Sequence, residues 1–161
     1  MITFGPIPSR RLGRSLGINN IPPKSCSYSC VYCQVGPTVH RETEPRPFYA
    51  PGEILTAVEE RLEATARAGE VVDYLTFVPD GEPTLDVNLG KTIALLKPLG
   101  VKIAVISNAS LLWREEVRAR LEGVDWLSVK IDTVDEVLWH RINQPHEALR
   151  LPHILDGIRQ M

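Results

Sequence analysis

Cysteine is scarce in this sequence, and no long apolar run occurs. The 161 residues contain three cysteines, all within the stretch CSYSCVYC (26–33). An odd number of thiols at spacings of four and three residues is poorly suited to mutual disulfides, so we expect a reducing, cytoplasmic location. No run approaches the roughly 20 apolar residues of a membrane span. The start, MITFGPIPSRRLG, lacks the apolar segment of a signal peptide. We therefore expect no association with a membrane.

A strong net charge is also absent. The formal charge is −2 and the pI is about 6.1, which argues against a protein that coats nucleic acid through bulk charge. The distribution is uneven, because residues 1–50 carry six Lys or Arg against two Asp or Glu. Among these cations, Arg10, Arg11 and Arg14 are suited to an RNA phosphate or a substrate carboxylate. They are equally suited to ion pairs inside the fold, and both interpretations stay open.

Apolar periodicity predicts alternating strands and helices. Strands are expected at 16–19, 71–78, 101–107 and 124–132. Helices are expected from Pro51 to a stop at Gly69 and over 86–99, 111–122, 134–142 and 148–161. Continuous apolar strands separated by amphipathic helices indicate the α/β class, with a parallel sheet and flanking helices. We expect a single domain over 1–161, with an amino-terminal extension at 1–24 and a Pro-rich surface loop at 36–50.

Polar segments follow the predicted strands. Ligands of parallel α/β folds bind beyond the carboxyl ends of the strands. This rule selects the cysteine stretch and the segments DGEPT (80–84), SNAS (107–110) and KIDT (130–133). Each segment alone is as consistent with an ordinary turn as with a binding site, but together with the thiols they predict one site.

Three thiolates suit zinc or an iron–sulfur cluster. A closed zinc site needs four ligands, and His40 would complete a Cys3His set with Cys26, Cys30 and Cys33. A 4Fe–4S cluster usually takes four cysteines, so three would leave one iron open to a substrate or cofactor. A simple electron carrier is disfavoured by the missing fourth cysteine. A zinc-stabilised binding module stays open as the alternative to an enzyme.

At this point the residues resemble a known family. CxxxCxxC with an aromatic residue before the last cysteine, here Tyr32, resembles the signature of the radical S-adenosylmethionine (radical SAM) enzymes. GEPT resembles the GGE motif of that family, although Asp80 stands where its first glycine usually lies. SNAS and KID resemble its ribose-contacting segments. FGPIPSRRLGRSLGIN and VPDGEPTLD resemble more narrowly a subgroup of iron–sulfur oxidoreductases related to wyosine-type tRNA-modifying synthases.

The resemblance implies two cofactors, a 4Fe–4S cluster and S-adenosylmethionine. Cys26, Cys30 and Cys33 would hold the cluster, and the methionyl amine and carboxylate would chelate the fourth iron. The ammonium would meet the backbone carbonyls of Gly81 to Pro83 or the Glu82 carboxylate, and Tyr32 would pack on adenine or shield the cluster. The implied cofactor-binding positions are Tyr32, Gly81, Glu82, Pro83, Thr84, Ser107, Asn108, Lys130 and Asp132.

The resemblance also implies an activity, partners and a larger fold. An electron from a reductant such as flavodoxin or ferredoxin would release a 5′-deoxyadenosyl radical, which abstracts hydrogen from a substrate, with a tRNA base as one candidate. The catalytic domain of the family resembles a six-strand partial TIM-type barrel. Four to five strands are expected here, so the barrel would be incomplete. A truncated chain, or a short form that dimerises through its exposed sheet edge, would explain this length.

Overall fold

A five-stranded sheet forms the centre of the molecule. The computed structural model describes residues 1–161, with the strands in the order β1-β2-β3-β4-β5. The strands are β1 (Thr3–Ser9), β2 (Gly13–Ile18), β3 (Tyr74–Phe77), β4 (Lys102–Ser107) and β5 (Trp126–Val129). β1 runs antiparallel to β2, whereas β2 to β5 are parallel. The expected α/β class, with four parallel strands and a fifth from the extension, is confirmed.

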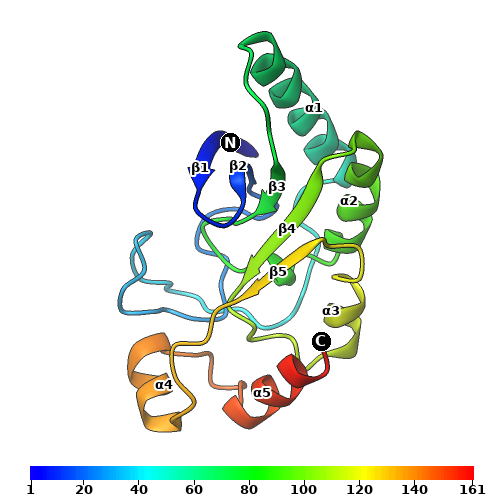
Figure 1. Cartoon of the computed structure of the whole chain (residues 1–161). Helices are drawn as coiled ribbons and strands as arrows, with labels where there is room; N and C mark the ends of the chain where they lie inside the picture. Colours follow the sequence, from blue (N-terminus) through cyan, green and yellow to red (C-terminus); the bar gives the residue numbers. More distant parts are fainter.

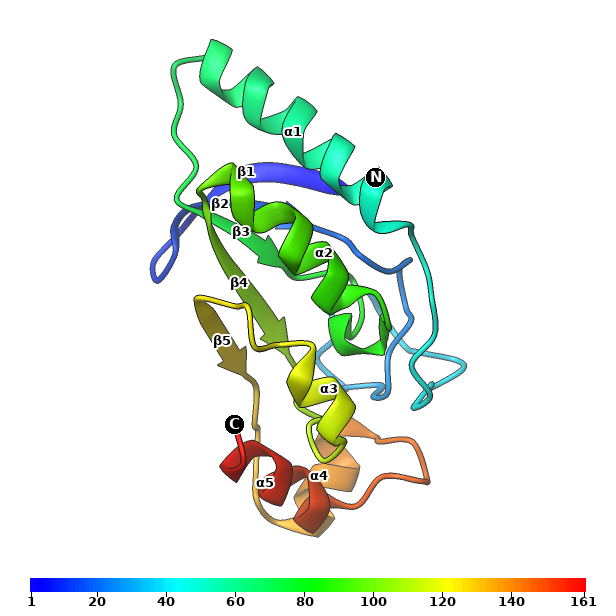
Figure 2. The ribbon, with the colours of Figure 1, turned by 90° about the vertical axis from the view of Figure 1, so that its right-hand side faces the viewer.

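Three helices cover one face of this sheet. The helices are α1 (Pro51–Arg67), α2 (Leu89–Leu96), α3 (Glu115–Ala119), α4 (Glu136–Asn143) and α5 (Leu151–Arg159), with short 3-10 turns η1 (Pro83–Leu85) and η2 (Lys97–Leu99). Figures 1 and 2 show α1, α2 and α3 along the same face, and α4 and α5 beyond the carboxyl ends of the strands. The main core therefore lies between the sheet and the first three helices.

Local sequence sets the ends of α1. Pro51 occupies its first turn, and the Glu53 carboxylate accepts a hydrogen bond from the Ala50 N–H at 2.8 Å. This contact satisfies an N–H that the helix leaves without a partner. Gly69 has a φ of 72°, a left-handed conformation that ends the helix. The predicted start and stop are both confirmed.

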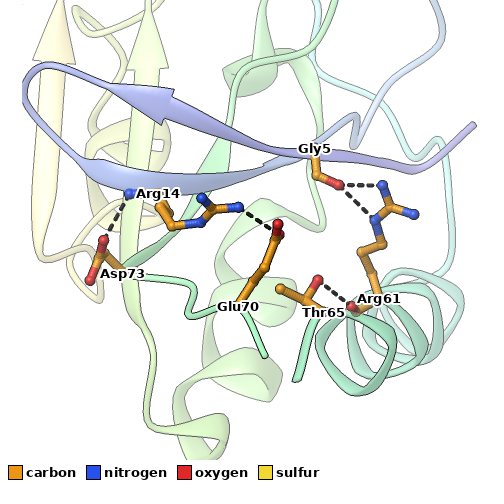
Figure 3. Close-up of polar contacts among 6 residues, drawn as sticks. All are labelled: Gly5, Arg14, Arg61, Thr65, Glu70 and Asp73. Atoms are coloured by element: carbon orange, nitrogen blue, oxygen red, sulfur yellow. Dashed lines mark hydrogen bonds and ion pairs between the residues drawn. The ribbon is translucent and has the colours of Figure 1, made fainter. Parts of the chain in front are cut away.

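The amino-terminal hairpin is tied to α1 by polar contacts (Figure 3). The Arg61 guanidinium donates to the Gly5 carbonyl, with its Nε at 2.7 Å. Arg14 forms an ion pair with Glu70 at 2.5 Å, and its backbone N–H donates to Asp73 at 2.7 Å. These bonds fix the hairpin against the sheet and helix.

Two sequence predictions need correction. Residues 1–24 were expected to hold one short strand, but they form the whole β1–β2 hairpin. Pro6 and Pro8 argue against a strand, and they are tolerated because β1 is an edge strand with a register shift between Phe4 and Ile7. The helix predicted at 111–122 is also shorter, because only α3 is α-helical there. Leu112 lies outside it, where its carbonyl accepts a hydrogen bond from the Arg118 side chain at 2.7 Å.

The chain has one long irregular stretch and one open sheet edge. Residues 36–50 contain no helix or strand, and most of them are exposed. β5 pairs only with β4, so its other edge is unpaired. Beyond β5, the side chains of Ile131, Val134 and Val137 are exposed by 46 %, 72 % and 67 %. None of the helices has the length and apolar character needed to cross a bilayer.

Gly157 provides a test of how α5 is held. A Cβ at this position would lie 2.3 Å from the Leu112 carbonyl carbon, which is backbone and cannot turn away. We expect Gly157→Ala to lower the free energy of unfolding by about 1–3 kcal/mol, the usual effect of overpacking. Chemical denaturation followed by circular dichroism measures it.

A second helical glycine is the matched control. Gly52 in α1 has no atom within 4 Å of the built Cβ. Gly52→Ala should therefore raise stability slightly, by about 0.5–1 kcal/mol. Equal effects of the two substitutions would contradict close packing between α5 and the backbone at Leu112.

Candidate active site

The cysteine loop, residues 24–33, is held by backbone hydrogen bonds on two sides. On one side, the Lys24 N–H donates to the Asp80 carbonyl at 2.7 Å, and the Glu82 N–H donates to the Ser25 carbonyl at 2.9 Å. On the other side, the Ser29 N–H donates to the Asn143 carbonyl at 3.0 Å. A loop without secondary structure is thereby fixed between the end of β3 and the end of α4.

The three thiols line one recess. Cys26, Cys30 and Cys33 are each partly buried, and the recess that they border has a volume of about 330 Å³. A second hollow of about 180 Å³ adjoins it and reaches Ser107, Asn108 and other strand-end residues. The first volume lies at the low end of the roughly 300–1,000 Å³ that ligand pockets occupy. The cysteine loop and all three strand-end segments therefore border two adjoining hollows that share the three cysteines.

A single metal ion has no prepared site. No three His, Cys, Asp or Glu side chains gather closely enough to hold one ion, and the His40 side chain is exposed. The alternative of a Cys3His zinc module therefore gains no support. A multi-iron cluster occupies the space between its thiolates and holds them farther apart than one zinc ion does. Three soft donors on one loop around a shared recess fit such a cluster.

Burial affects the Cys26 thiol strongly. Desolvation, followed by the negative charge of Glu82, raises its pKa to about 12 in the absence of metal. A bound metal deprotonates a coordinating thiol outright. Burial thus favours the neutral thiol until a cationic centre binds next to it.

Glu82 connects the loops that follow β3 and β4. Its side chain is 1 % exposed. Oε1 accepts hydrogen bonds from the hydroxyls of Thr84 at 2.6 Å and Ser107 at 2.7 Å, and Oε2 accepts one from the Asn108 N–H at 2.7 Å. Burial raises the pKa of this carboxyl, although the hydrogen bonds from Thr84, Asn108 and Ser107 oppose the increase. Accepting a ligand ammonium stays a prediction for Glu82, since the carboxylate here bonds within the chain.

Gly81 allows the loop after β3 to approach the cysteine loop. A Cβ at Gly81 would lie 2.2 Å from the Ser25 carbonyl oxygen, so no side chain fits. The Pro83 carbonyl accepts a hydrogen bond from the Asn20 side chain at 3.1 Å, and the Glu82 carbonyl accepts one from the Leu85 N–H at 3.2 Å. The Gly81 carbonyl has no such partner, which leaves it available to a donor on a ligand.

Asn108 lies next to both a thiol and the cysteine loop. Its side-chain Nδ2 is 3.6 Å from Cys26 Sγ and 3.1 Å from Ser27 Oγ. Ser27 Oγ in turn lies 2.5 Å from Ser110 Oγ. The SNAS segment is thus linked directly to the first cysteine.

Lys130 and Asp132 meet Tyr32 at the rim of the recess. The Tyr32 hydroxyl donates to Asp132 Oδ2 at 2.5 Å, and Lys130 Nζ lies 4.0 Å from the centre of the Tyr32 ring. Burial acts to raise the pKa of Asp132, but hydrogen bonds from Tyr32 and Asn143 and the Lys130 charge lower it overall. The two strand-end residues contact Tyr32 and form no ion pair with each other within 4.0 Å.

Sequence reasoning missed two residues that the structure brings to the site. Asn143, at the end of α4, is 2 % exposed and contacts Cys30. Tyr28 borders the recess and accepts a hydrogen bond from the Trp139 indole at 3.1 Å. Asn143 is the last residue of a helix and does not follow a strand, so the strand-end rule does not select it. Tyr28 lies inside CSYSCVYC, where its place between two cysteines was a usable signal.

The arginines near the amino terminus lie away from the recess. Arg10 and Arg11 are exposed in the turn of the β1–β2 hairpin, which precedes the first parallel strand. The cysteine loop follows the carboxyl end of that strand, at the opposite end of the sheet. Arg14 forms the ion pair with Glu70 described above, and this pair lies at the surface and not inside the fold.

Relatives of this chain are found among known proteins. The chain is 54 % identical over 157 residues to UPF0026 protein MJ1312 of Methanocaldococcus jannaschii, covering 98 % of this chain and 48 % of that relative. This chain thus spans about half the length of that relative.

Two solved structures share the fold. TYW1 with a lysine-pyruvate adduct bound has a TM-score of 0.60 at 17 % identity and covers 91 % of this chain and 50 % of its own. SuiB of Streptococcus suis bound to S-adenosylmethionine has a TM-score of 0.55 at 17 % identity, covering 87 % and 29 %. The sequence profile of the Radical SAM superfamily matches residues 20–154. This match covers most of the chain and includes all three cysteines, so the chain belongs to the radical SAM superfamily.

Proposed function

We propose that this chain is the cofactor-binding part of a radical SAM enzyme. Enzymes of the superfamily bind a 4Fe–4S cluster and S-adenosylmethionine. The observation that supports the proposal most is that three thiols, one fewer than a 4Fe–4S cluster usually takes, lie next to the polar ends of three strands. A set that leaves one iron open has a use only if another ligand binds beside it.

Each part of the recess would have its own task. Cys26, Cys30 and Cys33 would hold the cluster. When bound, the reduced cluster together with S-adenosylmethionine supplies a 5′-deoxyadenosyl radical that abstracts hydrogen from a substrate. The free Gly81 carbonyl would accept from the methionyl ammonium, and Asp132 would orient Tyr32 at the rim.

The Asn108 amide and the Ser107 hydroxyl are placed differently. Asn108 is partly exposed, and its Oδ1 already accepts a hydrogen bond from the Ser110 N–H at 2.9 Å. Ser107 is buried, and it donates to Glu82. Because Asn108 is the more exposed of the two, we assign the contact with the nucleoside to it. Ser107 would hold the conformation of the loop through its hydrogen bond to Glu82. Thr84 is buried and serves the same carboxylate.

The proposal also covers the electron donor. The cations Lys24 and Lys130 border the recess, which suits an acidic electron donor such as flavodoxin or ferredoxin. The proposal of an RNA substrate depends on the positive charge of residues 1–50, and it gains no support from Arg10 and Arg11, which lie at the opposite end of the sheet.

The open β5 edge and the exposed apolar side chains beyond it suit association with a second copy. The whole protein's substrate would be selected by segments beyond those described here, since this chain covers about half of its relative's length.

Anaerobic reconstitution with iron and sulfide tests the proposal. We expect electron paramagnetic resonance of the dithionite-reduced protein to show a cluster signal that changes when S-adenosylmethionine is added, because the cofactor would bind the open iron. Protein that takes up no cluster, or binds only zinc, would contradict the proposal. A cluster signal that does not change when S-adenosylmethionine is added would contradict binding of this cofactor by the chain.

A further inference from the structure

We infer that Asn143 is a positioning residue that tunes the proposed cluster through the Cys30 sulfur and links it to the Tyr32–Asp132 pair. The inference rests on the proposed function, since it requires a cluster on Cys30. Asn143 matches none of the sequence motifs. It is the last residue of α4 and is carried to the site by the fold alone.

The side chain of Asn143 bridges two groups of the site. Its Nδ2 lies 3.3 Å from Cys30 Sγ and 2.7 Å from Asp132 Oδ2. Asp132 Oδ2 also accepts the Tyr32 hydroxyl at 2.5 Å. One continuous chain of polar contacts thus joins Cys30, Asn143, Asp132 and Tyr32.

The chemistry of its partners fixes the orientation of this amide. An ionised carboxylate and a thiolate are both acceptors without a proton to give. The amide must therefore present its NH2 group to both, with one hydrogen for each. The backbone holds the residue in place, because the Asn143 carbonyl accepts the Ser29 N–H at 3.0 Å. Asn143 is 2 % exposed, so water does not compete for these bonds.

A hydrogen bond to a cluster sulfur stabilises the reduced state. Reduction adds negative charge to the cluster, and a donor at a ligating sulfur favours that charge. Removing the donor should therefore make the potential more negative. Asn108 holds a similar position at Cys26, but its Nδ2 lies 3.6 Å from the sulfur, and the residue is only partly buried. We therefore expect the stronger effect from Asn143.

The test uses Asn143→Leu, which keeps the branching at Cγ and removes the donor, and the smaller Asn143→Ala. Asn19→Leu is the matched control, because its amide donates to the Met1 carbonyl and does not line the recess. Each protein is reconstituted anaerobically in the absence of S-adenosylmethionine. The midpoint potential of the cluster is then measured by redox titration, followed by electron paramagnetic resonance. We expect the equilibrium constant for reduction of the cluster to fall about tenfold in both Asn143 variants. This corresponds to a midpoint potential about 59 mV more negative for one electron.

The outcomes separate this inference from the proposed function. If the wild-type protein forms no cluster, both the proposed function and this inference are contradicted. Wild-type potentials in both Asn143 variants, or an equal shift in the control, would overturn the inference alone. Loss of the native circular dichroism spectrum in both variants would also overturn it, because the amide would then serve the fold and not the cluster. A negative shift, or lost iron in a natively folded variant, supports it.

Discussion

Replacing Cys33 by alanine should abolish cluster binding while the protein stays folded. Cys33 is only partly buried, and its side chain has no hydrogen-bond partner in the structure, so the fold depends little on it. Only two thiols would then remain, since the chain has no cysteine beyond the three. Iron and sulfide content after anaerobic reconstitution should fall from a full cluster to near zero, with an unchanged circular dichroism spectrum.

His40→Ala is the control that separates a cluster from a zinc site. A Cys3His zinc site would need His40 as its fourth ligand, whereas a three-cysteine cluster does not. His40 is exposed, so its replacement should leave stability within about 0.5 kcal/mol. We expect full iron content in this variant. Equal metal loss in Cys33→Ala and His40→Ala would overturn the assignment of an iron–sulfur cluster.

Replacing Glu82 by alanine should weaken both the fold and the binding of S-adenosylmethionine. The backbone N–H groups of Thr84 and Asn108 would lose their acceptor in a buried place. Each unpaired buried donor costs about 1–3 kcal/mol, whereas burial of the carboxylate is itself unfavourable and its removal offsets part of this. The lost hydrogen bonds should prevail, so we expect the free energy of unfolding to fall by about 2 kcal/mol.

The same substitution should loosen the loops that line the recess. The Glu82 carboxylate is the contact that joins the loop after β3 to the loop after β4. We expect the affinity of the reconstituted protein for S-adenosylmethionine to fall at least about tenfold, measured by equilibrium dialysis, which corresponds to about 1.4 kcal/mol. Cluster content should be preserved, because the Glu82 carboxylate makes no hydrogen bond to a cysteine.

Two variants control for this result. Glu63 lies exposed on α1, so Glu63→Ala should leave both quantities unchanged. Glu82→Gln keeps one acceptor oxygen and should fall between the wild type and Glu82→Ala. Wild-type stability and affinity in Glu82→Ala would contradict the role of this carboxylate in joining the loops.

Sequence patterns anticipated the elements that depend on local chemistry. Pro51 and Gly69 mark the ends of α1 because proline suits a first turn and a left-handed glycine ends a helix. The apolar runs became β3 and β4, which are largely buried in the parallel sheet, and β5, an edge strand whose Leu127 and Val129 pack against the core. The strand β1 was missed because two prolines argue against a strand, and edge pairing is not visible in the sequence.

The sequence by itself determined the chemistry available to this protein: three soft ligands on one short loop, and polar segments at the ends of parallel strands. Only the tertiary structure decided which groups meet. It turned Glu82 into an internal link between two loops, moved Arg10 and Arg11 to the far end of the sheet, and placed Asn143 between Cys30 and Asp132. The physical reason is that thiol chemistry and strand patterning are local properties. A contact between residues 113 positions apart, such as Cys30 and Asn143, exists only once the sheet and helices have packed.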